Sequence, residues 1–162
     1  MEKEQILDFT RRISQSNRSG LTVINYEIIF AYLDDAKKAY QEASIYGEAV
    51  KLASSEDKTF SYIPDCSDLD IPDDLDYVYI CENNTIYGTK YKKLPNTKGH
   101  TLVADVSSCF LSEPVDVTKY GVIYGGVQKN VGPAGVVIVI IREDLITEDT
   151  LPGTPTMLKY KT

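Results

Sequence analysis

Tyr124-Gly-Gly-Val-Gln-Lys-Asn-Val-Gly-Pro-Ala-Gly135 is the stretch that decides the fold, because it joins two strongly apolar segments through a glycine-rich connection. The segments are Val122–Tyr124 and Val136–Ile141. The second consists of six consecutive β-branched residues, which predict a strand covered on both faces. Lys129 is held between the two segments, where we expect a chain to present an amine for covalent chemistry.

Apolar spacing predicts further elements upstream. The runs Tyr77–Ile80 and Leu102–Val106 indicate two more strands. Before them, apolar residues recur at steps of three and four from Ala36 to Tyr46, which predicts an amphipathic helix that Asp34 can cap and Gly47 can end. Strands that alternate with a helix and loops predict an α/β fold with a mainly parallel sheet and flanking helices, and the length favours one domain.

Composition restricts the class of protein. The 162 residues carry a formal charge of -7, and 43% of them are hydrophobic, without an apolar run near the length of a membrane span. We therefore expect a globular, cytoplasmic protein that binds neither nucleic acid nor membrane. The start Met1-Glu-Lys-Glu4 has no apolar core of the signal-peptide kind, which also disfavours secretion.

Cysteine and histidine limit the chemistry. The three cysteines, Cys66, Cys81 and Cys109, lack metal-ligand spacing, so buried reduced thiols are favoured over a metal site or a disulfide. His100 is the only histidine, which disfavours Ser-His-Asp and Cys-His mechanisms.

Asp105 is a second charged residue at the end of an apolar run, in Thr101-Leu-Val-Ala-Asp-Val-Ser-Ser108. A carboxylate and an amine are the two charges that a pyridine-ring cofactor needs. The segments of Asp105 and Lys129 closely resemble the phosphoserine aminotransferase family of class V pyridoxal-phosphate enzymes. The other matching pieces are Lys37-Lys-Ala-Tyr-Gln-Glu-Ala43, Ala53-Ser-Ser-Glu-Asp57, Tyr62-Ile-Pro-Asp65, Asn83-Asn-Thr-Ile-Tyr-Gly88, Leu111-Ser-Glu-Pro-Val-Asp-Val117 and Ile141-Arg-Glu-Asp-Leu145.

The resemblance implies a role for each of five residues. Lys129 would be the catalytic amine that binds pyridoxal 5'-phosphate, with burial or a nearby cation lowering its pKa, and Asp105 would hold the ring nitrogen protonated. Thr85 and Gln128 would contact the cofactor in the same pocket. Arg18, in Gln15-Ser-Asn-Arg-Ser19, faintly matches a family arginine that binds a substrate carboxylate.

The resemblance also implies a partial large domain of a fold-type I pyridoxal-phosphate transferase over residues 34–162, after a divergent segment at 1–33. The family's arginine-containing phosphate loop has no counterpart here, and Asp35 stands at the position of a tryptophan that stacks on the ring. An Asn-Thr pair from a neighbouring subunit and a C-terminal domain with a substrate-binding His-Arg would follow Thr162.

Two functions of different classes therefore stay open. The first is the family's activity in serine biosynthesis, which interconverts 3-phosphohydroxypyruvate and glutamate with phosphoserine and 2-oxoglutarate, in a homodimer or with a partner subunit. The second is a non-catalytic remnant that binds the cofactor weakly or pairs with a full-length subunit. Another transaminase of the same fold type would share Lys129 and Asp105, although it need not share the sequence around the lysine.

Overall fold

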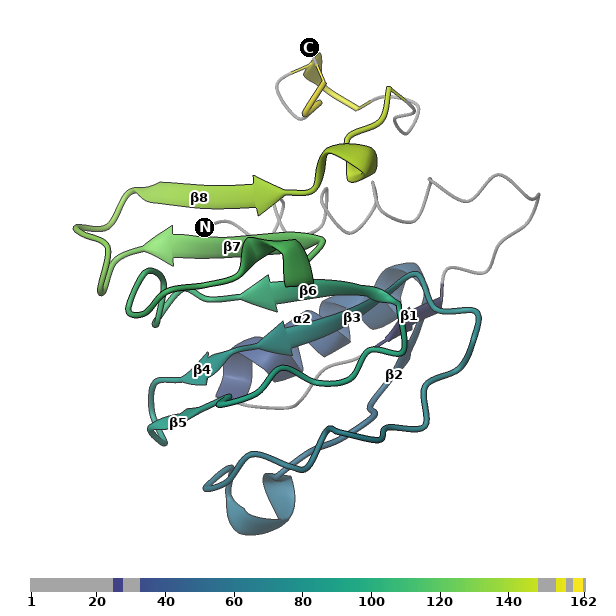
Figure 1. The fold of residues 1–162 in the computed structure, drawn as a ribbon, viewed down its shortest axis with the longest axis vertical. Helices are drawn as coiled ribbons and strands as arrows, with labels where there is room; N and C mark the ends of the chain where they lie inside the picture. Colours follow the sequence, from purple (N-terminus) through teal and green to yellow (C-terminus); the bar gives the residue numbers. More distant parts are fainter. Residues whose placement is uncertain (1–24, 28–32, 149–153, 157–158, 162) are drawn as a thin grey trace.

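The computed structural model describes residues 25–27, 33–148, 154–156 and 159–161 (Figure 1). Its main sheet has the strand order β3-β6-β7-β8. The bounds of these strands are β3 at Tyr77–Cys81, β6 at Thr101–Asp105, β7 at Val122–Val127 and β8 at Val136–Ile141. β3, β6 and β7 are parallel, and β8 runs antiparallel to β7. The predicted mainly parallel sheet is thus confirmed.

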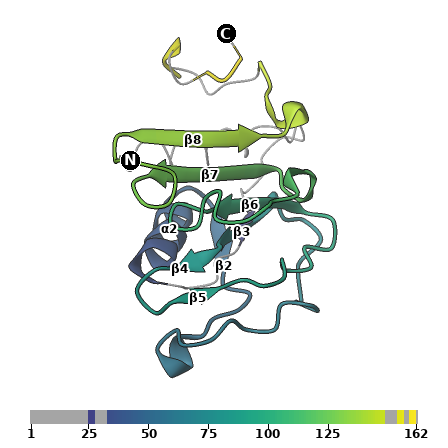
Figure 2. The same ribbon diagram turned by 60° about the vertical axis from the view of Figure 1, so that its left-hand side comes forward.

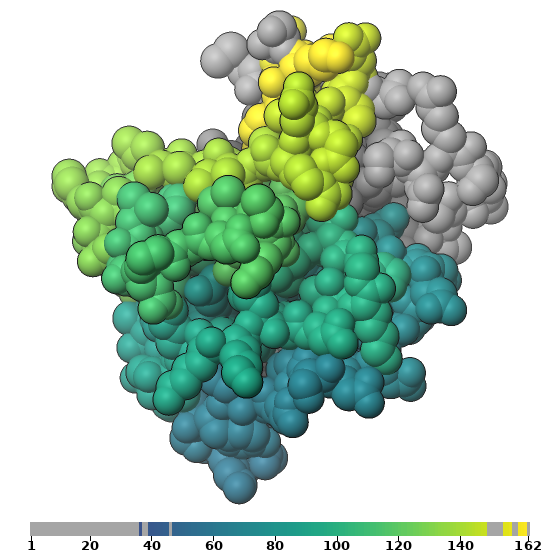
Figure 3. All heavy atoms as spheres, in the orientation of Figure 1, coloured from purple at the N-terminus to yellow at the C-terminus, as the bar shows by residue number. Residues whose placement is uncertain are grey.

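The smaller elements lie around this sheet. β1 at Asn25–Glu27 pairs in parallel with β2 at Glu48–Val50, and β4 at Asn83–Asn84 forms a short antiparallel hairpin with β5 at Thr89–Lys90. In the described part of the chain, three short 3₁₀ helices lie in the connections: η1 at Glu56–Lys58, η2 at Val117–Lys119 and η3 at Glu143–Leu145. In the space-filling view, the sequence colours run from blue at the bottom to yellow at the top, so segments close in the chain are mostly neighbours in space (Figure 3).

The helix α2 spans Leu33–Tyr46 and contacts β2 and β3 (Figure 2). Ala36 and Ala43 on it are buried in the core, and Ala39 and Tyr40 pack against that core. This face has the spacing of three and four residues that predicted the helix. The helix begins at Leu33, so Asp34 lies inside its first turn, and Gly47 follows its last residue as expected.

The core lies at the middle of the parallel strands. Val78, Ile80, Val103 and Val122 are almost completely buried. Strands buried on both faces need apolar residues at successive positions, and this explains the unbroken apolar runs that located them. None of the helices in the described part of the chain has both the length and the apolar character of a membrane span.

The expectation for Val136–Ile141 was half right. The segment is a strand, but it pairs only with β7 among the described strands, and it is not covered on both faces. Val136 is 59% exposed and Ile140 is 39% exposed. A run of β-branched residues specifies an extended strand, whereas its burial depends on which segments pack against it.

Candidate functional site

The carboxyl ends of the parallel strands β3, β6 and β7 point to one edge of the sheet, where β3 and β6 end at the same level and β7 continues past it to Val127. Cys81, the last residue of β3, pairs with Asp105, the last residue of β6, and Asp105 pairs with Tyr124 of β7. Polar residues that follow these strand ends are therefore brought to the same edge. Open α/β sheets bind ligands at this kind of edge, so we describe it as the candidate site.

Asp105 is half-buried at this edge and is held by Ser107. The backbone N–H of Ser107 donates to Asp105 Oδ1 at 2.9 Å, and Ser107 Oγ donates to the same oxygen at 2.6 Å. Ser107 Oγ also accepts a hydrogen bond of 3.0 Å from the N–H of Gly126 in β7. Two donors on one carboxylate oxygen favour the ionised form of Asp105.

Two buried tyrosines lie close to Asp105 in the adjacent strands. The hydroxyls of Tyr79 and Tyr124 are 2.9 Å apart and share a hydrogen bond. Burial raises the pKa of both phenols well above the usual value, and the charge of Asp105 raises the pKa of Tyr124 further. The tyrosines therefore stay neutral, and Asp105 is the acidic group beside them at this point of the site.

Lys129 lies two residues after β7, in the connection to β8. Its Nζ donates a hydrogen bond of 2.8 Å to Thr85 Oγ1, which belongs to the turn after β4. The structure thus brings together two residues that the sequence selected separately. Gln128 precedes Lys129 in the same connection and is also exposed.

The expected burial of Lys129 between apolar strands was wrong, because Lys129 is exposed. β7 ends at Val127, before the lysine, and β8 starts only at Val136. Apolar neighbours in the sequence form the strands, but they do not cover the connection between them. Solvent therefore reaches the amine in the described structure.

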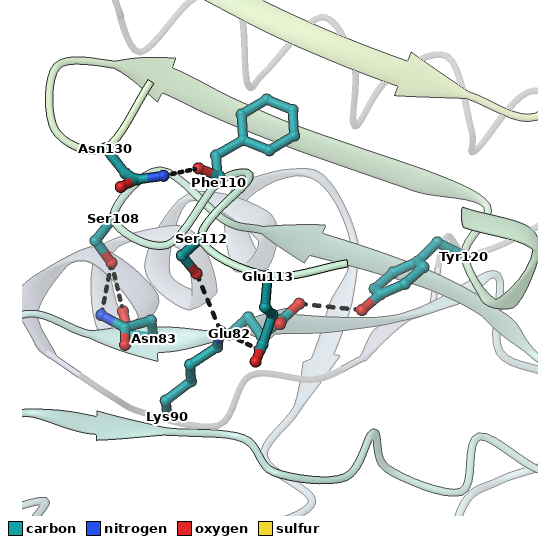
Figure 4. Close-up of polar contacts among 9 residues, drawn as sticks. All are labelled: Glu82, Asn83, Lys90, Ser108, Phe110, Ser112, Glu113, Tyr120 and Asn130. Carbon is teal, nitrogen blue, oxygen red and sulfur yellow. Dashed lines mark hydrogen bonds and ion pairs between the residues drawn. The ribbon is translucent and has the colours of Figure 1, made fainter. Parts of the chain in front are cut away.

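A single loop, Val106–Glu113, fixes the positions of the site segments (Figure 4). Asn83 Nδ2 donates to Ser108 Oγ at 2.8 Å, and that hydroxyl donates to the Asn83 carbonyl at 3.1 Å. On the other side, Asn130 Nδ2 donates to the Phe110 carbonyl at 2.9 Å. The segments that carry Thr85 and Lys129 are therefore attached to the loop that directly follows Asp105.

Below this loop is a charged cluster that the sequence did not reveal. Glu82 is buried, and it accepts a hydrogen bond of 3.1 Å from the Tyr120 hydroxyl (Figure 4). Burial raises the pKa of Glu82 above its ordinary value, while the Tyr120 bond and the charge of Lys90 oppose that rise. Lys90 donates to Ser112 Oγ at 3.3 Å and forms an ion pair with Glu113. Local sequence gave no signal of this cluster, since its members are as many as 38 residues apart.

The remaining sequence expectations have different outcomes. Arg18 lies outside the described residues, and only the backbone of Asp35, in α2, is described.

Cys66, Cys81 and Cys109 are free thiols, and Cys66 is buried. Burial raises the pKa of both Cys66 and Cys109 to about 11, so these thiols stay protonated. Within the described ranges, no three His, Cys, Asp or Glu side chains are grouped to hold a metal ion.

Comparison with known proteins assigns this chain to a family. Residues 38–160 match the model of the family "Aminotransferase class-V", and the chain therefore belongs to that family. The match includes all of the described main sheet, with Thr85, Asp105, Gln128 and Lys129.

Individual relatives are phosphoserine aminotransferases. The enzyme of Lysinibacillus sphaericus is 48% identical over 127 residues, which are 78% of this chain and 35% of the relative. The solved structure of phosphoserine aminotransferase from Bacillus circulans subsp. alkalophilus has a TM-score of 0.78 and 34% identity, covering 95% of this chain and 42% of that one. A phosphoserine aminotransferase structure that reports radiation damage of the Schiff base has a TM-score of 0.77 and 35% identity, covering 97% of this chain and 42% of that one. The chain thus spans about a third of the length of the curated relatives it matches.

Proposed function

We propose that this chain carries part of the active site of a phosphoserine aminotransferase. The proposed reaction interconverts 3-phosphohydroxypyruvate and glutamate with phosphoserine and 2-oxoglutarate, in cytoplasmic serine biosynthesis, with pyridoxal 5'-phosphate as cofactor. The observation that supports it best is the position of Asp105 at the end of β6 and of Lys129 just after the neighbouring parallel strand β7, inside the region that matches the family. The proposed assembly is a homodimer or a complex with a partner subunit.

The donor set at the strand ends fits this cofactor. Asp105 is a half-buried carboxylate whose two hydrogen bonds from Ser107 favour its ionised form, as a protonated ring nitrogen requires. Lys129 supplies a primary amine at the same edge. Thr85 Oγ1 accepts from Lys129 and keeps its own hydroxyl hydrogen for donation to an anionic group. Gln128 adds an exposed amide that can donate in the same way.

When bound, pyridoxal phosphate supplies an electron-withdrawing ring that stabilises negative charge at the α-carbon of the substrate. Asp105 holds a proton on the ring nitrogen, because a fixed carboxylate stabilises a neighbouring cation. Lys129 Nζ would take the proton from the substrate α-carbon and hold it for return. Thr85 orients Nζ through its hydrogen bond of 2.8 Å.

A second function remains for this chain, which is to bind cofactor or a full-length subunit without catalysis. The exposure of Lys129 favours it, because an exposed amine lacks the apolar walls that usually enclose a bound cofactor. The absence of tryptophan from the sequence also favours it, since ring stacking on an aromatic side chain contributes about 1 kcal/mol beyond area burial.

One set of measurements distinguishes the two functions. The purified chain is titrated with pyridoxal phosphate, its absorbance is recorded, and the complex is reduced with borohydride and mapped by peptide mass spectrometry. Specific binding labels Lys129, and the label disappears in Lys129→Ala. Equal labelling of the surface lysines Lys92 and Lys98 would show nonspecific amine chemistry and would contradict specific cofactor binding in either function.

A coupled assay with phosphoserine, 2-oxoglutarate and excess cofactor then tests turnover. Turnover that is lost in Lys129→Ala supports the aminotransferase. Labelling at Lys129 without turnover supports the non-catalytic role for the isolated chain. Lys92→Ala is the matched control, since Lys92 is exposed and outside the candidate site, and it should leave both measurements unchanged.

A further inference from the structure

Ser107 makes three hydrogen bonds at the candidate site. Its N–H and its hydroxyl both donate to Asp105 Oδ1, at 2.9 and 2.6 Å. Its hydroxyl oxygen accepts from Gly126 N at 3.0 Å. One short side chain therefore joins the end of β6 to Gly126 near the end of β7, shortly before the segment of Lys129.

These bonds restrict the Asp105 carboxylate. Because the N–H and the hydroxyl of Ser107 both donate to Oδ1, the carboxylate cannot rotate about its Cβ–Cγ bond without breaking two hydrogen bonds. A hydrogen bond to an ionised oxygen is roughly twice as strong as one between neutral groups. The orientation of Asp105 is thus set by Ser107, and the orientation of Ser107 is set in turn by Gly126.

The same pattern of two hydrogen bonds, from residue i+2 to the carboxylate of an aspartate at i, occurs on the surface away from the candidate site. Thr118 N–H and Oγ1 donate to Asp116 Oδ1 at 3.2 and 2.6 Å, and these bonds lower the pKa of Asp116. Asp116 and Thr118 are exposed in the connection between β6 and β7, outside the candidate site. This pair offers a matched control with identical local chemistry.

We propose that Ser107 is a positioning residue, which fixes the ionised Asp105 carboxylate against β7 so that it can hold the protonated ring nitrogen of the cofactor. The inference rests on the proposed function, since it assigns Asp105 to that nitrogen. Ser107 acts through Asp105 and Gly126, and it need not touch the cofactor itself.

The test compares Ser107→Ala with Ser107→Thr, Thr118→Ala and Asp105→Asn in the full chain. The dissociation constant of pyridoxal phosphate is measured by titration, and the pH dependence of the absorbance of the bound cofactor is recorded. Ser107→Ala should weaken binding about tenfold or more, because a hydrogen bond to a charged group is lost. Ser107→Thr keeps the hydroxyl and should restore binding, and Thr118→Ala should match the unmutated chain.

A second readout needs no cofactor. Hydrogen exchange of the Gly126 amide should accelerate in Ser107→Ala and return to normal in Ser107→Thr. If Ser107→Ala does not fold, Ser107→Cys replaces it, since a thiol keeps the volume but donates weakly. Thermal unfolding confirms that each variant is folded at the temperature of the titration.

The outcomes separate this inference from the proposed function. Weaker binding in both Asp105→Asn and Ser107→Ala, with rescue by Ser107→Thr, supports the inference. Weaker binding in Asp105→Asn alone overturns the inference and leaves the proposed function intact, even where Gly126 exchange accelerates. Unchanged binding in Asp105→Asn overturns the proposed role of Asp105, and the inference fails with it.

Discussion

Lys129 Nζ and Thr85 Oγ1 are joined by a hydrogen bond of 2.8 Å across 44 residues of sequence. The lysine follows β7 and the threonine follows β4, so this bond links two connections on the same side of the sheet. Both residues are exposed. Thr85 therefore orients the amine without burying it, and the position of Nζ depends on this hydroxyl.

The first prediction concerns that hydroxyl. Thr85→Val keeps the shape of the side chain but removes the acceptor, so Nζ should lose its preferred position. We expect slower covalent labelling of Lys129 by pyridoxal phosphate, measured after borohydride reduction, and near-normal labelling in Thr85→Ser. Thr89→Val, in the neighbouring strand β5, is the control for general disturbance of the hairpin. Equal labelling rates in Thr85→Val and the unmutated chain would refute an orienting role.

A second prediction compares two adjacent glycines of β7. A Cβ on Gly125 would lie 3.1 Å from Phe110 Cδ1 and 3.2 Å from Ser107 Cα, so the loop after Asp105 would have to move. A Cβ on Gly126 would have Ser107 Oγ at 3.9 Å as its nearest neighbour, which is ordinary contact. Overpacking of this kind costs about 1–3 kcal/mol. We expect Gly125→Ala to lower the urea midpoint clearly and Gly126→Ala to leave it nearly unchanged.

Gly125→Ala and Gly126→Ala also test whether the position of the loop after Asp105 affects cofactor binding. Because Gly125→Ala displaces Ser107, it should weaken pyridoxal phosphate binding more than Gly126→Ala does. Binding that is equal in the two variants would mean that the loop can shift without affecting the cofactor.

A third prediction concerns pH and Asp76, which precedes β3. Burial, together with the charge of Asp74, raises the pKa of Asp76 from 3.8 to about 6. The folded state therefore binds this proton more tightly than the unfolded state, and the free energy of unfolding falls as pH rises from about 4 to about 6. Asp76→Asn removes this charge. The free energy of unfolding of the variant should therefore exceed that of the unmutated chain most at neutral pH, and this difference should disappear below the unfolded pKa of Asp76.

Urea unfolding at a series of pH values measures this difference. Asp73→Asn is the control, because Asp73 is an exposed acid on the same connection. A constant difference between Asp76→Asn and the unmutated chain at all pH values would contradict the raised pKa.

The fourth prediction tests where the core lies. Ile80 of β3 is 0% exposed, whereas Ile86 in the turn after β4 is 74% exposed. Ile80→Val removes one buried methylene and should lower the free energy of unfolding by about 0.5–1.5 kcal/mol. Ile86→Val makes the same chemical change at the surface and should stay within about 0.5 kcal/mol of the unmutated chain. Equal losses at both positions would require Ile86 to be covered in solution.

Several features were predictable because they are encoded by neighbouring residues. Apolar runs located β3, β6, β7 and β8, with ends that differ from the predicted ones by at most three residues. The spacing of α2 did the same for the helix. These elements depend on backbone propensity and on periodic burial, which are both visible in a short window of sequence. The family resemblance selected Thr85, Asp105, Gln128 and Lys129 in the same way, from short motifs in order.

The sequence by itself therefore determined the four strands of the main sheet and the helix α2, and which side chains are candidates for the site, whereas the short strands β1, β2, β4 and β5 were not predicted. Only the tertiary structure decided that Cys81, Asp105 and Tyr124 lie level at one edge, that Ser107 holds Asp105, and that Lys129 is exposed beside Thr85. It also decided that β8 is partly exposed and that Glu82 is buried. The physical reason is that register, burial and side-chain hydrogen bonds depend on contacts between residues far apart in the chain, whereas local propensity fixes only the conformation of each segment.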